Sequence, residues 1–317
     1  MAILIDPPAW PAHGTLWSHL VSDTDYDELH AFAARLRIPR RGFDLDHYDV
    51  PASMYEQAIA EGALAVTAKD VVHRLRHSGL RVRQAEREAV SPVRRRQYLR
   101  SEWAALGEHL GVEQPARQQQ AEQGWQHLGD TLVARWNEPH RAYHDERHLE
   151  DVLLSLGQLA TRGERLHPET LLAAWFHDAV YTGNGGSDEH DSAQLAVASL
   201  GGFELDSGLV RLVGEMIVAT TPAIPVEDPP APLAQLLDAD LSIFASSSHR
   251  YEQYAVAVRT EYAHVPEADF AEGRARILET YLQQAAIYRT VAARQLWEQR
   301  ARLNLEREIE LLRQASA

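Results

Sequence analysis

The sequence contains no cysteine among its 317 residues. Disulfides, thiolate metal ligands and a cysteine nucleophile are therefore excluded, and any bound metal must be held by His, Asp or Glu. Oxygen and imidazole ligands favour harder or borderline divalent ions, here manganese, iron, magnesium, nickel or zinc. The residue types alone do not distinguish among these ions.

Lysine is almost absent. Lys69 is the only lysine, and acidic residues outnumber basic ones by 46 to 31, which gives a net charge of −15. That charge opposes non-specific binding to nucleic acid or to an anionic membrane. A cation that binds phosphate beyond Lys69 must be an arginine, whose planar guanidinium contacts two phosphate oxygens at once. A biased coding composition explains the same skew without any function.

Long hydrophobic runs are also missing. No window approaches the roughly 18 uninterrupted apolar residues of a membrane-spanning helix. At the N-terminus, Asp6 and the prolines that follow it interrupt the apolar residues too soon for a signal sequence. We therefore expect a cytoplasmic protein without a membrane segment. The length of 317 residues and a hydrophobic content of 45% predict two domains with substantial cores.

Residues 1–82 predict a small α/β domain. Residues 2–6 and 63–67 are expected to form strands, and two helices between them and one after them follow from the apolar periodicity. Two residue pairs have the spacing of helix N-terminal capping boxes: Asp25 with Glu28, and Thr67 with Asp70. The order strand, helix, helix, strand, helix predicts that the two strands pair in parallel.

A basic linker is predicted at residues 83–99, followed by an all-α bundle at residues 100–317. The stretch 81–100 carries seven arginines against two glutamates and interrupts the apolar periodicity. Because no aromatic ladder accompanies the charge, a solvated connector or helix face explains it better than a nucleic-acid patch. Beyond it every long segment has helical periodicity. Five prolines within residues 220–232 predict a loop.

Ionisable residues recur within the apolar helices of the second domain. His177 and Asp178 directly follow the apolar run 171–176, which would draw them into the interior. Charged groups there are costly unless they are paired or bound to a metal. Before them, His144 and His148 share one helix face.

Three helices would thus bring His148, the pair His177 and Asp178, and Asp240 to one divalent ion with mixed nitrogen and oxygen ligation. Each piece is common by itself, since a histidine on an apolar face is more often a core or surface residue than a ligand. The ordered set is the stronger signal. Asp238 lies two residues before Asp240, about 200° around a helix, so only one of the two would face an ion.

Four segments follow a recognisable pattern: E-P-H-R-x-Y-H-x-x-x-H, W-F-H-D-A-V-Y, D-E-x-x-S-A and L-D-x-D-L. They occupy residues 138–148, 175–181, 188–193 and 237–241. With these segments, residues 100–317 resemble the HD superfamily of metal-dependent phosphohydrolases, all-helical proteins with an H…HD…D signature. They are most similar to a bacterial group of HD phosphohydrolases. The resemblance implies an HD-type all-α helical bundle.

The resemblance also implies a ligand set. By position in the pattern, His148, His177, Asp178 and Asp240 would bind the metal. Relatives with two metals have further histidines between the HD pair and the last aspartate, whereas this interval holds only His190. One divalent ion per chain is therefore favoured.

The implied reaction is hydrolysis of a phosphate ester by a metal-activated water. The expected substrate is a nucleotide or another small phosphorylated metabolite. Asp178 would serve catalysis through the metal. Arg141 and Arg274 are the candidate substrate-binding cations, Arg141 also serving catalysis, and His144 and Glu189 are the candidate proton-transfer groups.

Other interpretations stay open. Arg274 is equally suited to pair with a buried carboxylate such as Glu261, and Glu189 to cap a helix. The glycine-rich segment 181–187 would gate the site or merely end a helix. A nucleotide-sensing or interaction module that binds without turnover is the rival function, and iron-dependent oxygenase chemistry of the HD type is a third. A homo-oligomer is compatible with the composition.

The N-terminal residues resemble a small bacterial domain family of unknown function. The resemblance rests on residues 3–7, 17–20, 28–33, 47–49 and 62–63, and it implies no activity.

Within that domain, Asp6, His19 and residues 47–49 lie where an α/β unit places a binding or catalytic site. They are equally suited to stabilise turns.

Overall fold

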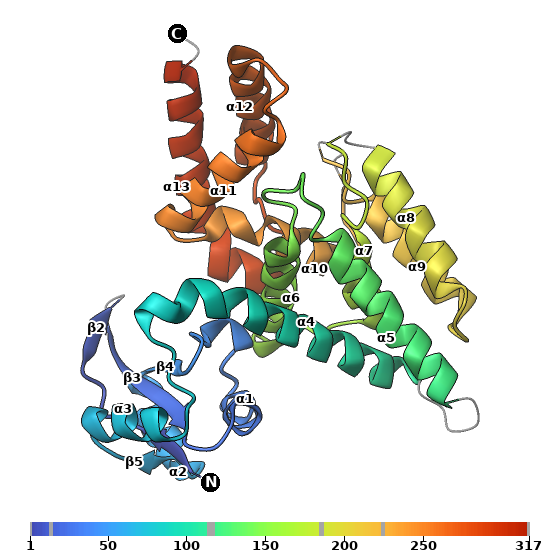
Figure 1. Cartoon of the computed structure of the whole chain (residues 1–317). Helices are drawn as coiled ribbons and strands as arrows, with labels where there is room; N and C mark the ends of the chain where they lie inside the picture. Colours follow the sequence, from blue (N-terminus) through green and yellow to red (C-terminus); the bar gives the residue numbers. More distant parts are fainter. Residues whose placement is uncertain (1, 13–14, 113–117, 184–186, 223–225, 316–317) are drawn as a thin grey trace. The chain divides into compact units, whose positions relative to one another are not determined.

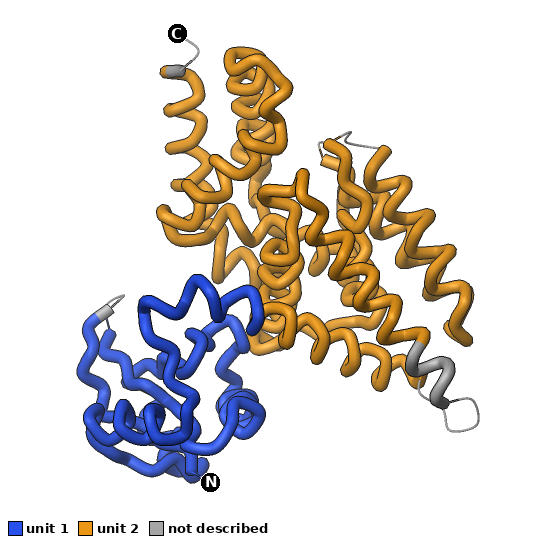
Figure 2. The backbone as a smooth tube through the Cα atoms, in the orientation of Figure 1, with its two compact units in different colours: residues 1–94 blue, residues 95–317 orange. Residues whose placement is uncertain are grey.

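The computed structural model describes residues 2–12, 15–112, 118–183, 187–222 and 226–315. The chain forms two compact units, residues 1–94 and residues 95–317 (Figure 2). The first unit contains a small mixed sheet with helices, and the described part of the second is helical. An α/β segment followed by a helical one is the predicted order.

The sheet of the first unit has five strands. β1 (Ile3–Ile5) pairs antiparallel with β3 (Thr15–Ser22) and parallel with β5 (Leu64–Ala65), which confirms the predicted parallel pair. β2 (Trp10–Ala12) and β4 (Tyr48–Pro51) each pair antiparallel with β3. β3, the longest strand, was not predicted from the sequence. Because β1, β2 and β4 all pair antiparallel with β3, the sheet contains more antiparallel pairs than the sequence predicted.

Helices cover both faces of this sheet. Ile3 and Ile5 pack in one hydrophobic cluster with α1 and α2, whereas Leu4 packs in another with α3. Because successive side chains of a strand point to opposite faces, β1 is buried on both sides. Thr67 and Asp70 form the predicted capping box, whereas Asp25 caps α1 by accepting from the backbone N–H of Glu28 while the carboxylate of Glu28 accepts from Ser22 instead. The helical segments of this unit are α1 (Tyr26–Arg35), α2 (Tyr55–Ala60) and α3 (Ala68–His77), with short turns η1 (Arg40–Gly42), η2 (Ala52–Met54) and η3 (Gln84–Glu86).

The predicted linker, residues 83–99, is largely helical. Most of it belongs to the first half of α4 (Arg87–Leu110), a continuous helix. Its arginines have acidic partners: Arg87 binds both carboxylate oxygens of Asp44, and Nε of Arg95 lies 2.8 Å from Glu150. The acidic partners lie far from these arginines in the sequence. The charge composition of the segment therefore could not predict that ion pairs fix it to the rest of the protein.

The helices of the second unit pack around two hydrophobic cores. One lies among α4 to α10, and the other among η4, α11, α12 and α13. In Figure 1, α8 lies beside α9 and α12 beside α13, and both pairs are in contact. The remaining bounds are α5 (Gln118–Arg135), α6 (Glu146–Thr161), α7 (Pro168–Phe176), α8 (Ser187–Leu200), α9 (Ser207–Val218), α10 (Ala231–Asp240), η4 (Leu241–Ala245), α11 (Ser248–Glu261), α12 (Glu267–Gln283) and α13 (Val291–Ala315).

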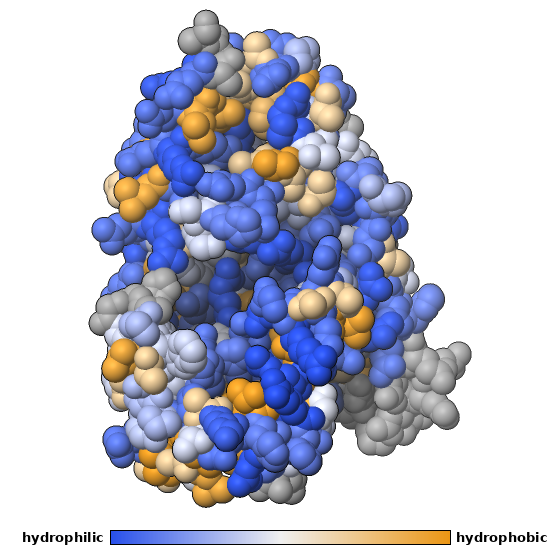
Figure 3. Space-filling view, turned by 60° about the vertical axis from the view of Figure 1, so that its left-hand side comes forward, coloured by the Kyte–Doolittle hydropathy of each residue, from blue (hydrophilic) through white to orange (hydrophobic). Residues whose placement is uncertain are grey.

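Figure 3 draws one face of the molecule, and that face is mostly polar. On the face drawn in Figure 3, hydrophilic residues predominate and hydrophobic residues are scattered among them. Isolated apolar side chains of this kind are normal on folded proteins. Among the described residues, no helix combines the length and the apolar character that crossing a bilayer requires.

α4 and α5 are joined by a reciprocal tryptophan pair. The rings of Trp103 and Trp125 stack with centroids 4.2 Å apart, and each indole N–H donates to the other residue's carbonyl. A glycine lies one helical turn after each tryptophan, Gly107 on α4 and Gly129 on α5. A Cβ at Gly129 would lie 2.3 Å from Cδ1 of Trp103, and one at Gly107 would lie 2.5 Å from Nε1 of Trp125. Only glycine therefore lets the two rings approach.

We predict that Gly129→Ala lowers the free energy of unfolding by about 2–3 kcal/mol, because the new methyl group would overlap the indole ring of Trp103, which stacks on Trp125 and donates to its carbonyl. Gly157→Ala is the matched control. Gly157 lies inside α6 and a Cβ there meets nothing within 4 Å, so alanine should stabilise by up to about 1 kcal/mol through helix propensity. Urea denaturation of both variants checks the prediction, and equal effects would contradict it.

Candidate metal centre

Four side chains from three helical segments meet at one point of the second unit. His148 comes from the first turn of α6, His177 and Asp178 end α7, and Asp240 is the last residue of α10. The Nε2 atoms of the two histidines are 3.3 Å apart. Asp240 Oδ1 lies 3.1 Å from Nε2 of His148 and 3.6 Å from that of His177. Asp178 Oδ2 lies 3.8 Å and 3.3 Å from the same two atoms.

These distances fit a cation at the centre. Ligands held about 2.1 Å from one ion lie roughly 3.0–3.5 Å from each other, which is the spacing of most of these pairs. Nδ1 of His177 is 2.9 Å from the carbonyl oxygen of Ala174. Because a carbonyl oxygen only accepts, Nδ1 carries a proton and Nε2 is the atom left to bind a metal. The two imidazoles and two carboxylates therefore form a donor set suited to a borderline divalent ion.

The pKa shifts of the cluster also indicate that positive charge is needed at its centre. Burial raises the pKa of Asp240, but hydrogen bonds with His148 and His177 outweigh it and hold the pKa below its ordinary value. Burial likewise raises the pKa of Asp178, and the charge of His177 lowers it to about 2. Burial lowers the pKa of His177, whereas Asp178 and Asp240 raise it well above its ordinary value. Both carboxylates are thus ionised at neutral pH and require positive charge between them, from protons or from a metal.

Asp238 and Asp240 point to different places. The carboxylate of Asp238 is completely buried and accepts hydrogen bonds from the backbone N–H groups of Arg289 and Thr290, each at 2.7 Å. Asp238 therefore anchors the start of α13, while Asp240 joins the histidines. This is the division expected for two residues about 200° apart on a helix.

Arg141 does not offer its guanidinium to a substrate. Its side chain is fully buried and donates to the carbonyl oxygens of His144, Asp178 and Ala179 and to the carboxylate of Glu138. All five N–H groups of the guanidinium are used in this way. Arg141 therefore positions the backbone that carries Asp178, and the substrate-binding and catalytic role expected for it stays an untested prediction.

Arg274 is also engaged elsewhere. Nε donates to Glu308 at 3.0 Å, and a terminal nitrogen donates to the hydroxyl of Tyr254 at 2.6 Å. Burial lowers the pKa of Arg274, but Tyr254 and Glu308 raise it above its ordinary value. These contacts do not favour the substrate-binding role predicted for Arg274, which stays untested. The alternative of a buried carboxylate partner is correct, although the partner is Glu308 and not Glu261.

Glu261, at the end of α11, organises the loop before α6. One carboxylate oxygen accepts from the backbone N–H groups of residues 142, 143 and 144, and the other lies 2.7 Å from Nδ1 of His144 and 3.0 Å from the hydroxyl of Tyr181. Burial raises the pKa of Glu261, but the bond with His144 outweighs it and lowers the pKa to about 2. The sequence offered Glu261 only as a partner for Arg274, because its true partners lie 80 to 119 residues away along the chain.

His144 lies beside the cluster, and Glu189 is buried in the first turn of α8. The ring of His144 stacks on Tyr181 with centroids 4.2 Å apart and lies 5.7 Å from the ring of His148. Burial lowers the pKa of His144, whereas Glu261 and Asp178 raise it above its ordinary value. Proton transfer by His144 or Glu189 stays a prediction. Part of the glycine-rich segment predicted as a gate, residues 184–186, lies outside the described residues.

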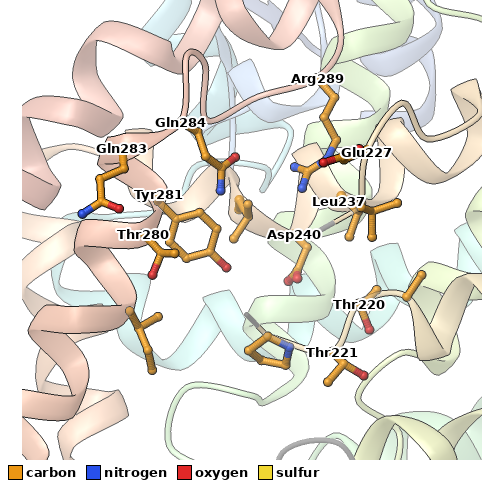
Figure 4. Close-up of a pocket in the computed structure, with 15 residues that line it drawn as sticks. Thr220, Thr221, Glu227, Leu237, Asp240, Thr280, Tyr281, Gln283, Gln284 and Arg289 are labelled. Carbon is orange, nitrogen blue, oxygen red and sulfur yellow. The ribbon is translucent and has the colours of Figure 1, made fainter. Parts of the chain in front are cut away.

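Asp240 also lines a pocket of about 450 Å³. Figure 4 shows its carboxylate among the side chains of Arg289, Tyr281 and Gln284. A terminal nitrogen of Arg289 has long contacts, 3.4 Å to the carbonyl oxygen of Ile287 and 3.8 Å to Asp238. Arg289 was not among the substrate-binding residues predicted from the sequence. Its only signal was that a phosphate-binding cation in this domain had to be an arginine.

Comparison with known proteins places only the first unit. Residues 3–78 match the model of a family described as a protein of unknown function (DUF4031). This confirms the resemblance of the N-terminal residues to a small domain of unknown function. No curated protein and no solved structure matches the chain.

Removing the charge of Glu261 should destabilise the second unit. The side chain is 2% exposed, and we predict that Glu261→Gln lowers the free energy of unfolding by about 2–4 kcal/mol, because it breaks a buried pair with His144. Glu272→Gln is the control, since Glu272 is a 69% exposed residue in a surface pair and should change stability by less than about 0.5 kcal/mol.

The effect of Glu261→Gln should also depend on pH. The folded-state pKa of Glu261 is lowered to about 2 from an ordinary value of 4.5. Its contribution to stability is therefore complete above pH 4.5 and is lost as the pH falls toward 2. Urea titrations at several pH values should show the gap between wild type and variant shrinking on acidification. A constant gap would contradict this account.

Proposed function

We propose that residues 95–317 form a metal-dependent phosphohydrolase of the HD type that acts on a small phosphate ester, such as a nucleotide. The observation that carries the proposal is the meeting of His148, His177, Asp178 and Asp240, because the last of these residues also lines a pocket that contains Arg289. These four residues occur along the chain in the order H…HD…D of the family that the sequence resembles.

The residues of the chain divide the work. The two histidines and two aspartates would hold the cation, which supplies acidity to water and polarises a phosphoryl group. Glu261 and Arg141 fix the backbone on either side of the ligands, so the donors are in place before a substrate arrives.

Two further side chains would meet the substrate. His144, held by Glu261 next to the ligands, is suited to move a proton to or from the reacting group. Arg289 replaces Arg141 and Arg274 as the cation for the substrate's phosphate, because its guanidinium lines the pocket with Asp240.

The metal itself is tested by elemental analysis. We expect this centre to hold about one divalent ion per chain, by the ligand count, so His177→Ala and Asp178→Ala should each contain about one ion fewer than the wild type. His249→Ala is a matched control, because His249 is an exposed histidine bonded to Gln253 and should leave the metal content unchanged. Full metal occupancy in Asp178→Ala would overturn the assignment. A loss of two ions in His177→Ala, with oxygen uptake by the wild type, would favour the oxygenase alternative.

The substrate class is tested by a screen of nucleotides and generic phosphate esters with several metals. We predict phosphate release in wild type and a loss of about 10- to 100-fold in kcat/KM for Arg289→Gln, the effect of one charged contact to phosphate. Metal content should not change in this variant. Arg276→Gln, at a 71% exposed arginine on α12, should behave as wild type. Binding of nucleotides without release of product would favour the sensing module instead.

A further inference from the structure

The first unit contains a second group of metal-ligating side chains, separate from the centre described above. One ligand atom each from His19, His47 and Asp49 lies within 4.8 Å of the others. His19 on β3 and Asp49 on β4 are direct partners in the antiparallel register. Because side chains alternate along a strand, the pairing of β3 with β4 places His19 and Asp49 on one face of the sheet, and His47 lies two residues before Asp49.

Both histidines are oriented by buried carboxylates. Nδ1 of His19 is 2.9 Å from Asp6 Oδ2, and Nδ1 of His47 is 2.7 Å from Asp46 Oδ1. An ionised carboxylate only accepts, so each Nδ1 carries a proton and each Nε2 is left to bind a cation. Nε2 of His47 already lies 3.4 Å from Asp49 Oδ1. A carboxylate behind each histidine is the arrangement that holds metal-binding imidazoles in place.

The two supporting carboxylates are themselves fixed. Asp6 and Asp46 are 1% and 0% exposed. The other oxygen of Asp6 accepts from the backbone N–H of His19, and the other oxygen of Asp46 accepts from Val82 N at 2.8 Å and from Arg81 at 2.9 Å. Turn stabilisation does not need two buried acids that each hold an imidazole. The outer ligand, Asp49, is 51% exposed, so the position between the three groups is open to solvent.

We propose that His19, His47 and Asp49 bind one divalent first-row transition metal, such as zinc or iron(II). Two imidazoles and one carboxylate are the donors that these ions prefer over magnesium or calcium. Three protein ligands leave coordination positions for water or for a small ligand with an oxygen donor, as in catalytic and not structural sites. Trp10, whose exposed ring lies edge-on to His19 with centroids 5.6 Å apart, would form an apolar wall for such a ligand.

The site is tested with Co²⁺, whose visible absorption reports nitrogen and oxygen ligation. The full chain carrying Asp178→Ala, which disables the other proposed centre, is titrated with Co²⁺ alone. One equivalent should bind. Asp49→Asn, a change at a half-exposed position that the fold tolerates, should weaken binding by about 10-fold or more, and His19→Ala should abolish the absorption.

The control removes another pair of histidines from the same unit. His73 and His77 lie one turn apart on α3 with ring centroids 4.7 Å apart, and their double replacement by alanine should leave Co²⁺ binding unchanged. Zn²⁺ should raise the thermal midpoint of the Asp178→Ala chain but not after His19→Ala. Binding that survives both Asp49→Asn and His19→Ala, binding lost with the α3 pair, or no binding at all would each overturn the proposal. None of these outcomes depends on the proposed hydrolase.

Discussion

The second unit depends on two buried imidazole nitrogens that face each other across 3.3 Å. The carboxylates of Asp178 and Asp240 lie within 4 Å of these nitrogens and add negative charge beside the two buried rings. Such a cluster is stable only with a cation at its centre, either protons or a metal. The packing of α6, α7 and α10 holds the groups in this arrangement.

Other charged side chains of the second unit stabilise this arrangement through hydrogen bonds to backbone N–H and carbonyl groups. Glu261 gathers three successive N–H groups before α6, Arg141 gathers three carbonyl oxygens around the HD pair, and Asp238 holds two N–H groups at the start of α13. Each of these charges is buried and paired, so each fixes loop conformation at a modest net cost. The first unit uses the same device, with Asp6 and Asp46 behind two histidines.

Polar residues on apolar helices were enough to predict that His148, His177, Asp178 and one of Asp238 and Asp240 would meet, and the resemblance to the HD pattern favoured Asp240. Their role as metal ligands stays a prediction. The sequence could not predict that the guanidinium of Arg141 donates to carbonyl oxygens up to 38 residues away. It also could not predict that Arg274 forms an ion pair with Glu308. An arginine's availability depends on tertiary partners, which periodicity does not report. β3 was missed for a related reason: its C-terminal half is buried on both faces, which removes the alternation that marks a strand.

The central claim is that a metal lies between the two histidines and the two aspartates of the second unit. Anomalous diffraction from crystals soaked in manganese or zinc salts, measured on both sides of the absorption edge, tests it directly. We predict a peak about 2.0–2.3 Å from Nε2 of His148 and of His177 and from an oxygen of Asp178 and of Asp240. An anomalous map without a peak at that position, with the imidazoles bonded directly to the carboxylates, would contradict the account.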